Sequence, residues 1–365
     1  MVLQTGSKVK FEPSPAQPCS QRTMKQNLIR SFVGLMGTGI VLTGCGQHGS
    51  DSRSNSHGDS RQFVIATVVK VDGIAWFEKM REGVERFGKD TGHDTFLLGP
   101  ARADASEQIQ IIEGLIAQEV DAICVVPFSV EAIEPVLQKA RERGIIVISH
   151  EASSQVNADV IIEPFDNAAF GRHLMDHLAK YMGEEGEYAT FVGSVTSESH
   201  NQWVKAAVQH QKLKYPQMTL VADRIEDSDD QNQAYEKAKQ LLVAHPNLKG
   251  IQTSAMSAVP GVSLAVEEKG LIDRVNVVGT SLVSVSGPYL ESGAARLISF
   301  WKPDDAGYAM CKLALMKLEG REITNGTDLG LDGFSSLQQS LDRSNLFYGS
   351  AWVDVTGDNV TEWSE

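Results

Sequence analysis

The chain has 365 residues, of which 33 are lysine or arginine and 47 are aspartate or glutamate, so its formal net charge is −14 at pH 7. An acidic surface repels a phosphate backbone, which argues against nucleic-acid binding. The four cysteines form no CxxC motif and are too few for a disulfide framework, so we expect neither a metal site nor a cofactor.

The N-terminal part has the pattern of an export signal. Lys25 and Arg30 precede an apolar run over 31–41, which is too short to span a bilayer core of about 30 Å. A charged segment before a short apolar one is typical of a secretory signal. The run ends in the sequence LTGC at 42–45, which resembles the bacterial lipobox and predicts lipidation of Cys45. The alternative is a chance match in an apolar stretch.

The leader divides into three parts. Residues 1–23 resemble an extension from a mis-assigned upstream start, with Met24 as the initiator, and 24–44 are the expected signal peptide. Residues 45–61 are rich in glycine and serine and predict a flexible tether. We therefore expect an exported protein, held by its lipid on the periplasmic or cell-surface side, with no other segment in the membrane.

From residue 62 the sequence alternates between short β-rich runs and amphipathic segments. In the first series we expect strands at 63–69, 94–98, 122–126 and 145–149. The expected helices are at 74–90, 105–118 and 129–142, the last followed by Gly144 as a cap.

A second series begins near Asp166. We expect strands at 188–192, 219–225, 250–254, 275–279 and 296–300. The expected helices are at 167–181, 200–214, 229–244 and 260–269. Such alternation predicts right-handed βαβ units and parallel sheets, so two similar α/β lobes should share one cleft at the carboxyl ends of their strands.

Cys124 falls in a buried-strand pattern and Cys311 in a helical one. A bridge between them is conceivable in an oxidising compartment, but we favour two unpaired core cysteines.

Enzyme motifs are largely missing from the sequence. No GxGxxG follows the first strand, and the chain has no P-loop, GxSxG or HExxH motif. His150, Glu151, Ser199 and His200 follow strands, so a hydrolase is one alternative. We favour a protein that is not an enzyme.

Polar and aromatic residues follow many of the predicted strands. Together they suit a sugar-like ligand, which needs paired hydrogen-bond donors and acceptors and an aromatic face. Some have a simpler explanation: Asp166 and Ser199 suit helix caps, and Phe77 suits the core. The candidate ligand-binding residues are Lys70, Trp76, Phe77, His150, Glu151, Asp166, Asn167, Ser199, His200, Asn201, Ser254, Met256, Thr280, Ser281 and Trp301.

Over about 62–356 the chain resembles the sugar-type periplasmic binding proteins of ABC importers, closest to their rhamnose-binding and autoinducer-2-binding subgroups. The segments that carry the resemblance are 199–205 (SHNQWVK), 278–281 (VGTS), 287–293 (GPYLESG) and 298–301 (ISFW). The resemblance implies two Rossmann-like lobes joined by a three-strand hinge, the type I fold, which close on a small sugar. It also implies a permease and its ATPase as partners. A chemoreceptor or a sensor kinase is an alternative partner.

The resemblance extends unevenly to the ligand positions. Lys70 matches a lysine of the autoinducer-2 group, and Glu151 matches its acidic residue in kind. Ser199 and His200 stand where that group has Asp-Gln, and Ser254 and Met256 where it has proline and alanine. These departures favour a monosaccharide such as rhamnose, with autoinducer-2 as the alternative.

The resemblance also sets the expected lobe boundaries. The N-terminal lobe should comprise 62–165 and 301–327, and the C-terminal lobe 166–300 and 328–365. The crossovers between the lobes are then expected near 163–167, near 299–301 and near 325–333.

Overall fold

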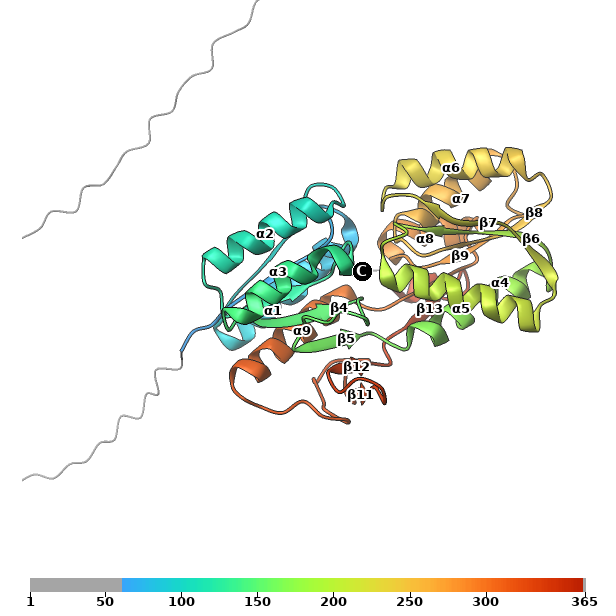
Figure 1. The fold of residues 1–365 in the computed structure, drawn as a ribbon. Helices are drawn as coiled ribbons and strands as arrows, with labels where there is room; N and C mark the ends of the chain where they lie inside the picture. Colours follow the sequence, from blue (N-terminus) through green and yellow to red (C-terminus); the bar gives the residue numbers. More distant parts are fainter. Residues whose placement is uncertain (1–60, 364–365) are drawn as a thin grey trace, which may run out of the picture. The chain divides into compact units, whose positions relative to one another are not determined.

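The computed structural model describes residues 61–363, which form two β-sheets with helices packed on both faces of each (Figure 1). Both sheets belong to one compact unit that starts at Asp59. The predicted signal peptide, the lipidation site Cys45 and nearly all of the tether lie outside the described residues. Within 61–363, no helix combines the length and the hydropathy needed to cross a membrane.

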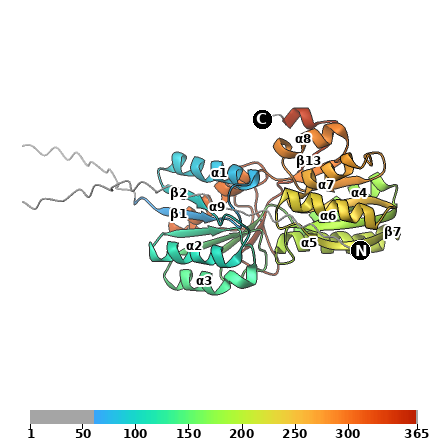
Figure 2. The same ribbon diagram turned by 90° about the horizontal axis from the view of Figure 1, so that it is seen from above.

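The first sheet has the strand order β11-β12-β5-β4-β3-β1-β2, and its pairings are parallel except that of β11 with β12. Helices α1 (Ala75–Thr91) and α9 (Pro303–Leu318) pack together on one face, and α2 (Ala105–Ala117) and α3 (Val130–Glu142) cover the other (Figure 2). Its strands are β1 (Val64–Val68), β2 (Asp94–Leu98), β3 (Ala122–Val125), β4 (Ile146–His150), β5 (Val160–Glu163), β11 (Gln338–Gln339) and β12 (Leu346–Tyr348).

The apolar pattern explains these elements. On β1, Ile65 belongs to the core under α1 and α9, whereas its neighbour Ala66 belongs to the core under α2 and α3. A strand covered on both faces therefore reads as a continuous apolar run. On α1, Met80, Val84 and Phe87 recur at helical spacing and are fully buried, each contributing about 1.5–3 kcal/mol of transfer free energy.

The second sheet has the order β13-β10-β9-β8-β6-β7, parallel except for β13 at one edge. Its strands are β6 (Glu185–Val192), β7 (Gln217–Glu226), β8 (Leu248–Thr253), β9 (Asn276–Gly279), β10 (Leu297–Phe300) and β13 (Val353–Val355). The helices of this half are α4 (Asn167–Met182), α5 (Glu198–Lys214), α6 (Gln231–Ala244), α7 (Ala258–Glu268), α8 (Val283–Ser292) and the 3₁₀ helix η1 (Val360–Trp363).

The predicted alternation of strands and helices is confirmed, with boundaries within a few residues of those expected. The sequence did not predict β5, α8 or the short strands near the C-terminus. Helix α8 contains Pro288, a residue that normally argues against a helix interior. Strands β11 and β12 have only two and three residues, too few to show a period.

In its described part the chain passes between the sheets three times. The crossovers from β5 to α4 and from β10 to α9 fall where they were expected. The third prediction, near 325–333, is wrong. Strand β12 pairs in parallel with β5, so the chain stays with the first sheet until Tyr348 and joins the second only at Val353. Residues 328–348 therefore do not belong to the C-terminal lobe, because the free edge of β5 is completed by β12.

Cys124 on β3 and Cys311 on α9 are both buried free thiols. Burial raises the pKa of the Cys124 thiol, and Cys311 beside it raises it further. The Cys311 Sγ lies 3.9 Å from the Thr67 hydroxyl.

Candidate functional site

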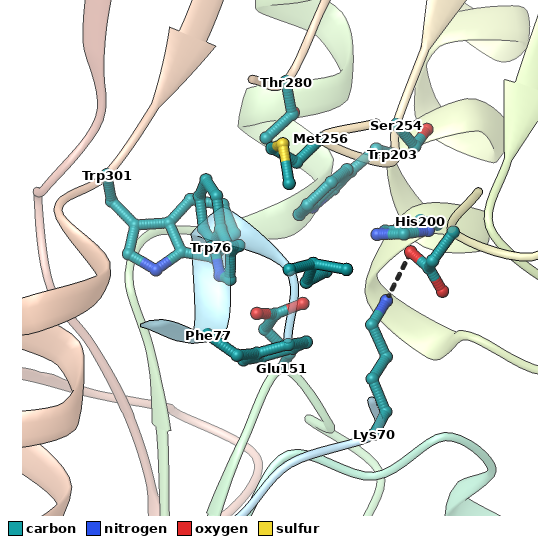
Figure 3. Close-up of a pocket in the computed structure, with 12 residues that line it drawn as sticks. Lys70, Trp76, Phe77, Glu151, His200, Trp203, Ser254, Met256, Thr280 and Trp301 are labelled. Carbon is teal, nitrogen blue, oxygen red and sulfur yellow. Dashed lines mark hydrogen bonds and ion pairs between the residues drawn. The ribbon is translucent and has the colours of Figure 1, made fainter. Parts of the chain in front are cut away.

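A small cavity with a free volume of about 20 Å³ lies where the carboxyl ends of strands from both sheets face each other. It is shown in Figure 3 with its side chains. The first sheet contributes residues that follow β1 and β4, and the second contributes residues that follow β6, β7, β8, β9 and β10. Its lining is Lys70, Ile74, Trp76, Phe77, Glu151, His200, Trp203, Asp229, Ser254, Met256, Thr280 and Trp301.

A buried ion pair lies on one side of this cavity. The Lys70 Nζ lies 3.0 Å from the Asp229 Oδ1, and the two side chains are 6% and 5% exposed (Figure 3). Burial opposes the charge on Lys70, but Asp229 and Glu151 outweigh it and raise the pKa of the lysine. Burial would raise the pKa of Asp229, but the ammonium group of Lys70 lowers it instead. Both partners are therefore charged, and together they link the loop after β1 to the loop after β7.

The loop after β7 holds Asp229 in an unusual conformation. Ser228 and Asp229 have φ of 57° and 54°, in the left-handed region that residues other than glycine rarely adopt. The Asp229 amide donates to Asp227 Oδ1 at 3.0 Å. Burial and the charge of Asp229 raise the pKa of Asp227 well above its usual value, which favours the protonated form of Asp227.

Glu151 enters the cavity from the first sheet. It also has a positive φ, 58°, directly after β4. Its Oε2 accepts a hydrogen bond of 3.2 Å from the Ser199 hydroxyl on α5, which joins the two halves of the site. The neighbouring His150 is fully buried, with Nδ1 2.7 Å from the Ile162 carbonyl. Burial lowers the pKa of His150, so this ring is neutral.

His200 is a neutral donor. Its Nδ1 accepts from the Gly193 amide at 3.2 Å, so the proton of the neutral ring is on Nε2. Burial lowers the pKa of His200 to about 3, and the positive charge of Lys70 acts in the same direction.

Aromatic rings form the opposite wall of the cavity (Figure 3). The rings of Trp76 and Trp301 meet edge to face at 4.6 Å, and Trp203 lies 5.9 Å from Trp301. The indole N–H of Trp203 donates to Asn167 Oδ1 at 2.6 Å, and the Asn167 amide donates to Glu163 at 3.0 Å. This chain of hydrogen bonds fixes the Trp203 ring.

Several polar atoms of the lining are buried and have no hydrogen-bond partner among the described residues. They are Asp229 Oδ2, Ser254 Oγ, Thr280 Oγ1 and Trp301 Nε1. Such a group costs roughly 1–3 kcal/mol when it is left unpaired. All four atoms belong to residues of the lining, and the set contains both donors and acceptors.

The structure brings many of the predicted residues to the cavity. Those that line it are Lys70, Trp76, Phe77, Glu151, His200, Ser254, Met256, Thr280 and Trp301. The remaining predicted residues are engaged in other contacts.

Asn167 and Ser199 hold the lining residues Trp203 and Glu151 by hydrogen bonds, and the His150 ring lies edge-on to Trp301 with centroids 6.1 Å apart. Asp166 is exposed and caps α4, and Asn201 donates to the carbonyls of Ser194 and Ser197 at the start of its own helix.

The Ser281 hydroxyl donates to the Met256 carbonyl at 2.9 Å and contacts Ser286. Position after a strand was therefore not sufficient, because local capping and loop contacts engage these side chains.

Sequence reasoning missed Asp229, Trp203 and Ile74 as lining residues. Asp229 was interpreted as the start of a helix, although it follows β7 just as Glu151 follows β4. Its place after a strand, within the acidic run of 227–230, was the available signal. Trp203 was noted only as part of a motif and Ile74 as part of a helical pattern.

The contacts do not assemble a hydrolase. Ser199 donates to Glu151, while His200 and His150 use their Nδ1 atoms on backbone groups. In the region that the structure describes, no hydrogen bond is found between Ser199 and either histidine, so a nucleophile with its base is not formed there.

Two largely parallel α/β sheets whose strand ends meet at a small cavity define a two-lobed protein of the type I periplasmic binding fold. The family model of the periplasmic binding protein domain matches residues 65–322, and the chain belongs to this family of solute-binding proteins, which are not enzymes.

Two curated relatives are similar over most of their length. The D-ribose/D-allose-binding protein of Pseudomonas aeruginosa is 27% identical over 267 residues, covering 70% of this chain and 81% of the relative. The D-allose-binding periplasmic protein of Escherichia coli is 27% identical over 258 residues, covering 68% and 82%.

Solved structures share the fold. A solute-binding protein of an ABC transporter from Clostridium phytofermentas, with bound L-rhamnose, has a TM-score of 0.76 at 22% identity and covers 83% of this chain and 98% of its own. LsrB from Clostridium saccharobutylicum in complex with AI-2 has a TM-score of 0.75 at 20% identity and covers 83% and 100%.

Proposed function

We propose that this protein is the lipid-anchored solute-binding component of an ABC importer and takes up one small neutral sugar in the cavity described above. The observation that carries this proposal is the set of unpaired buried polar atoms that belong to residues lining a small cavity, together with the tryptophan rings of the same lining. The names of the curated relatives, which are ribose- and allose-binding proteins, support the same ligand class.

The size of the cavity bears on how a sugar enters. The free space between the lining side chains is only about 20 Å³, less than a monosaccharide needs, so the lobes must part before the ligand is bound.

The charges of the lining support a neutral ligand. Lys70 is already compensated by Asp229, and Glu151 adds a second acidic side chain. An anionic ligand would face two carboxyl groups against one ammonium group. Sugar hydroxyls donate and accept at once, so one hydroxyl suits Asp229 Oδ2 as well as His200 Nε2.

Apolar groups beside the polar ones favour a 6-deoxy sugar such as rhamnose. Ile74 and Met256 lie in the lining together with Trp76 and Trp301, and they give a methyl group an apolar contact. The protein with bound L-rhamnose shares this fold.

Autoinducer-2 is the second candidate, because Lys70 matches the lysine of that group and the AI-2 complex of LsrB shares the fold. Its weakness is that His200, Ser254 and Met256, which depart from that group's pattern, all line the cavity.

The contacts between the two halves suggest how the ligand is enclosed. Besides the ion pair, the Glu198 carboxylate on α5 accepts from the Ser153 hydroxyl at 2.9 Å and from the Ser154 amide at 3.0 Å. We propose that the lobes close about the crossovers and that these contacts form on closing. The closed form would then deliver the sugar to the permease and its ATPase, with a chemoreceptor or a sensor kinase as the alternative partner.

The ligand experiment is a thermal-shift and calorimetric titration of the full-length protein with L-rhamnose, D-ribose, D-allose and autoinducer-2. We expect one saturable shift with a monosaccharide, lost in Trp301→Ala and retained in the surface variant Lys89→Met. A flat response to a broad panel of sugars and polyols would overturn the proposal.

The anchor is tested separately. We expect Cys45→Ser to abolish incorporation of a labelled fatty acid and to release the protein from membranes, whereas Ser50→Ala in the tether should do neither. Fatty-acid labelling that persists in Cys45→Ser would contradict the anchor without affecting the sugar site.

A further inference from the structure

Outside the cavity, two histidines and an aspartate converge on one point. His173 and His177 are four residues apart on α4, so they share one face of the helix. Asp354 lies on β13, and both of its oxygens are 2.9 Å from the His173 Nε2. The His177 Nε2 is 3.8 Å from Asp354 Oδ2, and all three groups offer ligand atoms within 4.8 Å of one another.

The cluster is held by its surroundings. The Ser299 hydroxyl on β10 donates to Asp354 Oδ1, and Ser299 and Asp354 face each other in the antiparallel pair of β10 and β13. The His173 ring stacks on Trp352, with centroids 5.4 Å apart and an angle of 28°. The aspartate and one imidazole are therefore oriented before any ligand arrives.

His177 is not accounted for by a simple hydrogen-bonded pair. The His173–Asp354 contact is complete without it, and 3.8 Å is too long for a hydrogen bond. Its Nδ1 is buried and has no hydrogen-bond partner among residues 61–363.

The spacing suits a metal ion. Zinc binds imidazole nitrogen and carboxylate oxygen at about 2.0–2.2 Å, which places tetrahedral ligand atoms about 3.4 Å apart. The observed 2.9 and 3.8 Å lie on either side of that value. We propose that the Nε2 atoms of His173 and His177 and the Asp354 carboxylate bind a divalent transition-metal ion of the zinc class.

The ligand types exclude the hard cations. Calcium and magnesium prefer oxygen ligands, whereas two imidazoles suit zinc, cobalt or nickel. The three side chains are 23%, 28% and 33% exposed, so water reaches the site and completes the coordination. Sequence reasoning predicted no metal site, because the third ligand is far along the chain from the other two.

The site lies beside the three crossovers rather than in the cavity. Helix α4 begins just after the first crossover, Ser299 precedes the second, and Asp354 follows the third. A metal ion would thus tie these three elements together at the base of the C-terminal lobe.

A second histidine–carboxylate pair on the same side of the sheet provides a matched control. The His210 Nε2 is 2.7 Å from Asp176 Oδ1, but Lys214 Nζ at 2.9 Å and the Tyr215 hydroxyl at 2.6 Å contact the same oxygen. A cation already occupies that carboxylate, so we expect no metal there.

The test is a titration of the metal-free, full-length protein with Co²⁺, followed by competition with Zn²⁺. We expect the strong visible absorption of four-coordinate Co²⁺ and quenching of tryptophan fluorescence through Trp352. His177→Gln should weaken binding at least tenfold and abolish the absorption. Ser299→Ala should weaken binding by about 10- to 100-fold, as loss of a residue that orients a metal ligand does.

His210→Gln should bind Co²⁺ as the unaltered protein does, and so should Lys70→Met, which separates this site from the sugar cavity. His48 and His57 of the leader are present in every variant, so any Co²⁺ that they bind contributes equally to every titration. Circular dichroism of the metal-free variants checks folding, and Asp354→Asn replaces any variant that fails to fold. Unaltered Co²⁺ binding in His177→Gln, or no binding by the original protein, would overturn the proposal.

Discussion

The ammonium group of Lys70 lies 3.0 Å from the carboxylate of Asp229, and this buried ion pair connects the loop after β1 with the loop after β7. The pair belongs at once to the lining of the cavity and to the contact between the two lobes. Its contributions to ligand affinity and to stability can be measured separately.

We predict that Lys70→Met weakens sugar binding by about 10- to 100-fold, the range expected for the loss of a hydrogen bond to a charged group. Asp229 would remain as an unpaired buried carboxylate, and breaking a buried ion pair typically costs about 3–5 kcal/mol. Calorimetry and chemical unfolding measure the two effects. Lys89→Met on the surface of α1 is the control, and an unchanged affinity in Lys70→Met would remove this lysine from the ligand site.

Gly193 sets the position of Asp229. A Cβ atom at this glycine would lie 2.6 Å from Asp229 Oδ1 and 2.7 Å from Oδ2, so an added methyl group must displace the carboxylate. We expect Gly193→Ala to weaken sugar binding by about tenfold or more through the lost contact, at about 1.4 kcal/mol per tenfold change. The helical Gly114 has open space around its Cβ position, and Gly114→Ala should leave affinity unchanged. Equal affinities in the two variants would contradict the prediction.

Glu198 closes the rim of the site. It accepts from Ser153, from Ser154 and from Gln202, the last at 2.6 Å. We expect Glu198→Ala to shift the ligand-free protein towards an open form, seen as a larger radius of gyration in solution scattering, and saturating sugar to restore the compact value. The apparent affinity for the sugar should fall in proportion to the fraction of the protein that is closed. Glu131→Ala, in the surface groove that Glu131 and Glu198 both line, is the control. Identical scattering of the two variants would contradict the prediction.

His200 should make stability depend on pH. Its folded pKa of about 3 is below the ordinary 6.5, so below pH 6.5 the unfolded chain binds a proton that the folded protein refuses. The His200 contribution is therefore lost as the pH falls from 6.5 towards 3, by up to about 1.4 kcal/mol per pH unit.

The pH dependence of His200 must be measured as a stability difference between the original protein and a His200 variant. Other buried groups change the stability with pH in the opposite direction. Burial raises the pKa of Glu163 and of Asp227, so their protonated forms favour the folded state at low pH. We therefore expect the stability difference between the original protein and His200→Gln to shrink between pH 7 and pH 5. A difference that is constant with pH would show that His200 is not held neutral by burial.

Many residues that line the cavity were predicted from the sequence because they directly follow a predicted strand. Lys70, Glu151, His200 and Thr280 were predicted as ligand residues because each follows a strand, and all four line the cavity. Asp166 satisfied the same rule but caps its own helix. The rule selects loops and not side-chain directions, since a capping bond within the loop competes with the cavity.

The sequence by itself determined the alternation of buried strands and amphipathic helices, because strands covered on both faces and helices covered on one leave a local apolar period. It also located the loops that surround the ligand site. Only the tertiary structure decided which distant residues meet. The partner of Lys70 is 159 residues away, and Asp354 is 181 residues from His173. No local period records such pairings, because they arise from the packing of β12 on β5, of β13 on β10 and of one lobe against the other.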